Sequence, residues 1–168
     1  MKQNILIVDD EPDIRDVISV ILNDEVYNTN CVSNAQEAQA KINIEMPSLI
    51  ILDIWMRDST MDGLSLLNWI KDSNPEIPVL MISGHGTVEI AVNAIKAGAY
   101  DFIEKPFKSE KLLFMVSRAL ENSELKKENE ELKQQVRRTD MIVGKSSIIN
   151  SVRQTIAKVS QTNSRVLI

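Results

Sequence analysis

The chain has 168 residues, 43% of them hydrophobic, which is enough for one packed domain with some sequence left over. Residues 1–120 hold 18 acidic and 10 basic side chains, whereas residues 121–168 hold 6 and 9. The acidic first part argues against nucleic-acid binding there. A single cysteine, Cys31, excludes an internal disulfide, and no signal peptide or apolar run of membrane length is present. We therefore expect a cytoplasmic protein without a membrane partner.

Short apolar runs alternate with helical patterns along residues 1–120. Strands are expected at 4–8, 29–32, 48–53, 79–82 and 100–104, and helices have their apolar positions within 14–22, 35–42, 64–70, 88–95 and 112–120. In the first helix the helical spacing predicts one packed face, formed by Ile14, Val17, Ile18, Ile21 and Leu22. Five such strand-helix units predict an α/β fold with a doubly wound parallel sheet and helices on both faces.

The run 48–53 organises the chain because it is a fully apolar strand that ends in a carboxylate, Asp53. Three other strands also lead into polar residues: the first into Asp9 and Asp10, the fourth into Ser83 and the fifth into Lys105. The carboxyl ends of parallel strands share one edge of the sheet, and ligands bind at that edge. We therefore expect these five side chains to meet there.

Three carboxylates at one edge repel one another, at about 4 kcal/mol for a pair about 4 Å apart. Such a site holds protons or a cation, and its all-oxygen ligands favour Mg²⁺ or Mn²⁺ over zinc. The Lys105 ammonium and the Ser83 hydroxyl can bind a phosphoryl group on Asp53, the nucleophile. Lys105-Pro106 is a candidate cis peptide. Taken singly, Asp10 could be a helix cap, Lys105 solvated and Ser83 without a role, so the specificity lies in the combination.

On these residues, positions 1–120 resemble the receiver domain of two-component response regulators, which has a flavodoxin-like sheet of strand order 2-1-3-4-5 and five helices. The resemblance implies that Asp53 is phosphorylated by a sensor histidine kinase. It also implies that Asp9, Asp10 and Asp53 hold Mg²⁺ together with the backbone carbonyl of Trp55.

The same resemblance implies a switch. Ser83 corresponds to the switch hydroxyl, Phe102 to the switch aromatic and Lys105 to the lysine that senses the phosphoryl group. Phosphorylation would then draw Ser83 inward, let Phe102 rotate and remodel the face formed by the fourth helix, fifth strand and fifth helix.

The loop after Asp53 departs from the family pattern. Receiver domains commonly have Met-Pro here, but Met56 is followed by Arg57, and residues 58–61 lengthen the loop before Asp62-Gly63. We expect this loop to alter kinase choice or phosphoryl lifetime, and it resembles the NtrX branch of the NtrC family. Trp55 and His85 either tune water access to the phosphoryl group or have no such role.

Residues 121–138 carry ten charges, five of each sign. Leu125, Asn129, Leu132 and Val136 follow the spacing of a coiled-coil seam, and Asn129 at such a position favours a parallel pair. This predicts a coiled-coil linker helix over 121–139 and a homodimer through residues 109–138. The alternative is a solvated linker helix.

Residues 140–168 resemble the truncated start of the AAA+ domain of sigma-54-dependent activators. Gly144-Lys145-Ser146 does not form a phosphate-binding loop, because Thr139 stands where that motif requires glycine. We expect no ATP hydrolysis by this chain. Contacts with DNA and sigma-54 RNA polymerase are expected only from regions absent from it.

The leading hypothesis is a phosphorylation-dependent response regulator that controls nitrogen- or redox-related, sigma-54-type transcription through a dimeric linker. The alternative is a stand-alone receiver that acts as a phosphate sink or partner-binding module. Two enzyme classes on similar sheets fit less well. Acidic residues 9–11 would repel a flavin phosphate, and a haloacid-dehalogenase phosphatase needs Asp-x-Asp where Asp9 and Asp10 are adjacent.

Overall fold

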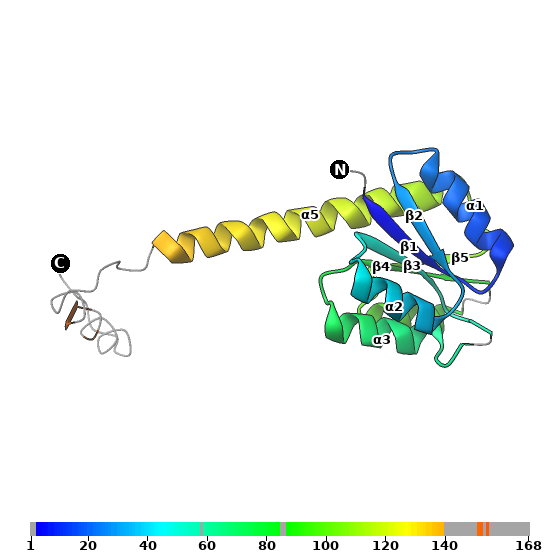
Figure 1. Cartoon of the computed structure of the whole chain (residues 1–168), viewed down its shortest axis with the longest axis horizontal. Coiled ribbons are helices and arrows are strands. Elements are labelled where there is room, and N and C mark those ends of the chain that lie inside the picture. The colour runs from blue at the N-terminus through cyan, green and yellow to red at the C-terminus, as the bar shows by residue number, and fades with distance from the viewer. Residues whose placement is uncertain (1–2, 58, 85–86, 140–150, 153, 155–168) are drawn as a thin grey trace. The chain divides into compact units, whose positions relative to one another are not determined.

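The computed structural model describes residues 3–57, 59–84, 87–139, 151, 152 and 154 (Figure 1). Five strands form one parallel sheet in the order β2-β1-β3-β4-β5. Their bounds are β1 Asn4–Val8, β2 Asn28–Val32, β3 Leu49–Asp53, β4 Val79–Ser83 and β5 Asp101–Glu104. The expected doubly wound α/β fold with strand order 2-1-3-4-5 is confirmed.

Helices alternate with the strands: α1 Pro12–Asn23, α2 Ala35–Ile44, α3 Gly63–Ser73, α4 Val88–Lys96 and α5 Ser109–Thr139. Local sequence explains several helix ends. Asn34, Asp62 and Thr87 cap α2, α3 and α4 by accepting hydrogen bonds from backbone amides of the first turn. After α4, Gly98 adopts a φ of 96°, as a residue that ends a helix in the left-handed region does.

Each face of the sheet packs against its own set of helices (Figure 1). On one face, the α2/α3/α4 cluster contains alternate residues of β3, Ile50 and Leu52. On the other face, the α1/α5 cluster contains Leu49 and Ile51. Because successive strand residues point to opposite faces, β3 is buried on both sides, as its unbroken apolar run predicts.

In two helices, α1 and α4, some of the apolar residues that recur at helical spacing in the sequence are exposed. Ile18 and Leu22 of α1 are buried, but Val17 is 53% exposed, so the prediction that Val17 packs inward is wrong. Neighbouring helix residues point about 100° apart, which turns Val17 away from the stripe centred on Ile18. In α4 only Ala94 is buried, whereas Val88, Val92 and Ile95 are exposed.

Helix α5 continues without interruption past residue 120 to Thr139, and the chain divides into two compact units, Met1–Leu125 and Lys126–Ile168. The first part of α5 buries Leu112, Val116, Ala119 and Leu120. Further along, Leu125 and Leu132 are both more than half exposed. The side chain of Val136 and most of residues 140–168 lie outside the described residues. Among the helices that are described, none is long and apolar enough to span a membrane.

Candidate functional site

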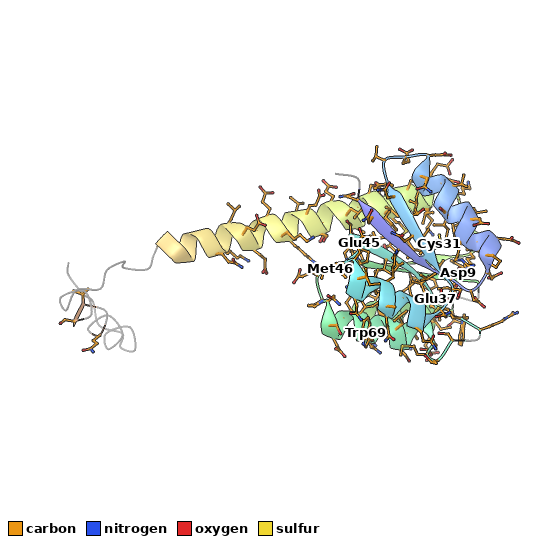
Figure 2. All side chains as sticks on the ribbon, viewed as in Figure 1. Asp9, Cys31, Glu37, Glu45, Met46 and Trp69 are labelled. Atoms are coloured by element: carbon orange, nitrogen blue, oxygen red, sulfur yellow. The ribbon has the colours of Figure 1, made fainter. Side chains whose placement is uncertain are left out.

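The polar residues expected at one edge of the sheet lie at the carboxyl ends of four neighbouring strands. Asp9 directly follows β1 (Figure 2), Asp53 and Ser83 are the last residues of β3 and β4, and Lys105 follows β5. The parallel register brings these ends together, since Asp53 pairs with Ile82 and Ser83 with Glu104. Asp9, Asp53 and Ser83 are all buried.

Lys105 connects the two buried carboxylates. Its Nζ lies 2.7 Å from Asp9 Oδ2 and 2.9 Å from Asp53 Oδ1, and 3.5 Å from Glu11 Oε1. The side chain of Lys105 is itself only 11% exposed. The cation that offsets the repulsion between Asp9 and Asp53 in this structure is therefore the Lys105 ammonium.

Backbone amides hold the remaining oxygens of these carboxylates. Glu11 N donates to Asp9 Oδ1 at 2.9 Å, and Trp55 N donates to Asp53 Oδ2 at 2.8 Å. Each oxygen of Asp9 and Asp53 thus has a partner in the chain, and both side chains are fixed in direction.

The pKa of Asp53 is raised to about 6, chiefly because burial disfavours the charged carboxylate, while Asp9 adds a repulsive negative charge. The hydrogen bonds from Lys105 and Trp55 act in the opposite direction. Burial lowers the pKa of Lys105, but its bonds to Asp9 and Asp53 outweigh burial, so the net shift is upward. The Lys105 side chain is therefore positively charged at neutral pH. The ionised form of the Asp53 carboxyl is disfavoured by burial.

A cavity of about 470 Å³ opens beside Asp53 and Lys105. It is also bordered by Asp10, Glu11, Trp55, Met56, Arg57, Asp62 and Gly84. The cavity is large enough for a phosphoryl group and a hydrated cation, and Asp53 is a buried carboxylate of its lining that contacts Lys105. Trp55, which is 55% exposed, stands at its border.

Asp10 borders the same cavity but does not contact Lys105 within the distance of an ion pair. Its Oδ2 accepts a hydrogen bond from the backbone N–H of Arg57 at 3.0 Å. Further along this loop, Ser59 Oγ accepts from Ala35 N, the first residue of α2, at 3.1 Å. Sequence reasoning missed both bonds. The absence of proline at position 57 was the available signal for the first bond, and the sequence carried none for the second.

Asp9, Asp10 and Asp53 are the predicted ligands of a divalent cation. No three His, Cys, Asp or Glu side chains within the described part of the chain are grouped as metal ligands. The donor chemistry nevertheless fits Mg²⁺: Asp9, Asp10 and Asp53 offer carboxylate oxygens, and with Lys105 their formal charge sums to −2. A divalent cation would balance that charge.

The residues expected to form the switch lie nearby. Ser83 is buried at the end of β4, and its backbone carbonyl accepts from Lys105 N at 2.8 Å. Phe102 is half-buried and packs against the α2/α3/α4 cluster. The Lys105-Pro106 peptide is cis, as expected. His85 lies outside the described residues.

Comparisons with known proteins agree with this arrangement. Residues 5–117 match the model of the response regulator receiver domain. The whole chain is 52% identical to the nitrogen assimilation regulatory protein NtrX of Azorhizobium caulinodans, of which it spans 37%. The crystal structure of NtrX from Brucella abortus is 51% identical, with a TM-score of 0.77, over 99% of this chain and 36% of that one.

A second similar structure is the solution structure of the beryllofluoride-activated NtrC4 receiver domain dimer. It is 41% identical, with a TM-score of 0.68, over 71% of this chain and 98% of that one. The family model covers more than half of the chain, and the sheet order is the one expected for it. The chain belongs to the response regulator receiver domain family, with sequence similarity to NtrX.

Proposed function

We propose that this chain is the phosphoacceptor of a two-component system. An oxygen of the Asp53 carboxylate attacks the phosphorus of a phosphohistidine on a sensor kinase; a P–O bond forms, the P–N bond breaks and the imidazole leaves with the bonding electrons. The observation that carries this proposal is the position of Asp53, a buried carboxylate that lines a cavity and has the Lys105 ammonium 2.9 Å from its Oδ1. That ammonium stabilises negative charge as it develops on the phosphoryl oxygens.

Asp9, Asp10 and Asp53, with the backbone carbonyl of Trp55, would hold Mg²⁺, or Mn²⁺ in its place. When bound, the ion would supply positive charge to the phosphoryl oxygens. Asp9 also has a role of its own, because its 2.7 Å bond orients the Lys105 ammonium toward Asp53. The carboxylate donor set and its net negative charge support this assignment.

Ser83 and Phe102 are proposed as the switch. The Ser83 hydroxyl, buried at the end of β4, would bind the phosphoryl group, and Phe102 on β5 would repack in response. The half-buried state of Phe102 supports this role, because such a side chain has room to change its packing. The affected face includes α4, where Val88, Val92 and Ile95 are exposed.

The output is proposed to be dimerisation through residues 109–138 and, in a longer protein, control of sigma-54-type transcription. The exposed Leu125 and Leu132 support the dimer, since they share the predicted seam. The dimeric receiver of NtrC4 and the name of the Azorhizobium relative support the regulatory role. The chain spans about a third of the length of that relative, so the transcriptional part of the proposal concerns segments beyond it.

Intact mass spectrometry after incubation with acetyl phosphate and Mg²⁺ tests the phosphoacceptor. We expect the mass of one phosphoryl group on the native chain, none on Asp53→Asn, and none when EDTA replaces Mg²⁺. The matched control is Asp72→Asn, which changes an exposed acid on α3 and should be phosphorylated like the native chain. An adduct that persists in Asp53→Asn would overturn the assignment.

Sedimentation velocity distinguishes the dimeric switch from the stand-alone receiver. A seam through Leu132 predicts that Leu132→Lys makes the chain monomeric, whereas Gln134→Lys, a neighbouring exposed position off the seam, leaves the dimer intact. A native chain that is monomeric with and without phosphorylation would instead support a phosphate sink or partner-binding module.

A further inference from the structure

The loop after β3 is held at three alternate residues. The amide of Trp55 binds the carboxylate at the end of β3, the amide of Arg57 binds Asp10, and Ser59 Oγ accepts from Ala35 N of α2. These bonds fix the loop to β3, to the residues after β1 and to the start of α2. Three of its residues, Trp55, Met56 and Arg57, also border the cavity, so this described part of the loop forms a bonded section of the cavity wall.

Asp10 differs from the other two carboxylates in its bonding. Asp9 and Asp53 each use both oxygens within the chain, and both contact Lys105. For Asp10, the hydrogen bond from Arg57 to Oδ2 is its one hydrogen bond to the described residues. Asp10 is half-buried and borders the cavity, so its Oδ1 is the carboxylate oxygen left available to a cation there.

We propose that the backbone N–H of Arg57 positions the Asp10 carboxylate for Mg²⁺, by holding Oδ2 so that Oδ1 faces the cavity. The inference rests on the proposed function, since it concerns the ion expected there. Hydrogen bonds to a ligating carboxylate fix its orientation, and losing such a bond costs about 10–100-fold in metal affinity. Arg57 is a positioning residue, and the group that acts is its amide, which a proline would lack.

A Mg²⁺ titration of the full chain, followed by tryptophan fluorescence, tests this role. Trp55 borders the cavity and should report binding, and Trp55→Phe should remove the signal. Arg57→Pro removes the amide and should raise the Mg²⁺ dissociation constant about 10-fold. Arg57→Ala keeps the amide and should stay within about twofold of the native value. Equal constants for the proline and alanine variants would overturn the proposal.

A double variant shows whether Arg57→Pro weakens Mg²⁺ binding through Asp10 or through a general disturbance of the loop. In an Asp10→Ala background, Arg57→Pro should have little further effect on the Mg²⁺ dissociation constant, because the carboxylate that the amide holds is gone. A 10-fold loss that persists in that background would overturn the proposal. A native chain that shows neither a fluorescence change nor a higher Tm with Mg²⁺ would instead contradict the proposed function itself.

NMR of the native chain gives a readout that does not depend on the folding of a proline variant. The Arg57 amide proton should resonate downfield because it is bonded to a carboxylate, and Asp10→Ala should shift it upfield while Asp72→Asn leaves it unchanged. Saturation with Mg²⁺ should keep the downfield position, since the bond is retained when the ion binds. An upfield shift on saturation would show that the ion and the amide compete for Asp10, and would overturn the proposal.

Discussion

The interior of β3 and its last residue are equally buried but lie in different surroundings. Leu52 is fully buried among the apolar side chains of the α2/α3/α4 cluster. Its neighbour Asp53 is 3% exposed and contacts Lys105, close to a second carboxylate. Burial of a leucine side chain stabilises the fold by about 1.5–3 kcal/mol, whereas burial of a carboxylate costs free energy that hydrogen bonds and an ion pair only partly offset.

This difference shows how the receiver separates stability from chemistry within one strand. The apolar positions of β3 hold the sheet between its two layers of helices. The strand end holds a carboxylate whose pKa is raised to about 6, together with a lysine that contacts two buried acids. A group kept ionised at a cost is well placed to react with an electrophile, because reaction relieves part of that cost.

Truncation in the strand interior should have the largest effect on stability. Leu52→Ala removes a fully buried side chain from the α2/α3/α4 cluster and should lower the free energy of unfolding by about 2–5 kcal/mol. Urea denaturation measures the loss. Ile44→Ala, at an exposed position of α2 outside the proposed dimer seam, is the control and should change the stability by less than about 0.5 kcal/mol. A loss at Leu52 no greater than at Ile44 would contradict the contrast between the interior of β3 and its last residue.

A smaller loss is expected where the polar end of β3 meets α3. A Cβ at Gly63 would lie 2.1 Å from the carbonyl oxygen of Asp53 and 2.7 Å from Ile54 Cα, so Gly63→Ala must displace backbone. We expect a loss of about 1–3 kcal/mol in the same denaturation experiment. Gly84→Ala is the control, because a Cβ there meets no atom within 4 Å among the described residues beyond its chain neighbours. If the two alanine variants were equally stable, the close approach of α3 to Asp53 would not be a constraint.

Much of the site follows from the sequence because parallel strands carry their end residues to a common edge. The apolar runs ending at Asp53 and Ser83 predict both strands and their polar ends, and the structure places them as expected. Helical spacing likewise predicts helices α1 and α4, but it does not predict which side of each helix is covered by the rest of the fold. Val17 and Val88 are exposed, although both belong to the apolar residues that recur at helical spacing in their helices.

Other features of the site depend on interatomic distances in the folded chain, which the residue types in the sequence do not predict. The sequence places Asp62-Gly63 after a lengthened loop, and the structure shows that Asp62 caps α3 and that Gly63 is its first residue, packed against backbone. The bond between Arg57 and Asp10 uses a backbone amide, which any residue but proline supplies. The position of Lys105 between the two buried acids Asp9 and Asp53 likewise follows from the packing of the strands and not from the residue types alone.

The smallest effect, and one of opposite sign, is expected at Asp53 itself. Asp53→Asn removes the buried charge but keeps an oxygen that can accept from Lys105, so in the absence of metal it should stabilise the chain by about 1–2 kcal/mol at pH 7.5. The pKa of Asp53 is raised in the folded state, so its contribution to stability is fully present below the unfolded-state value near 4. That contribution is lost as the pH rises through about 6, the folded-state pKa.

The stability difference between Asp53→Asn and the native chain should therefore grow between about pH 4 and pH 6 and then level off. Thermal or urea unfolding with EDTA across this range measures it. Asp72→Asn, at an exposed position, should show no such rise. A native chain more stable than Asp53→Asn at pH 7.5 would mean that the bond to Lys105 outweighs the burial of the carboxylate. In that case the end of β3 would stabilise the fold as its interior does, and the contrast between Leu52 and Asp53 would not hold.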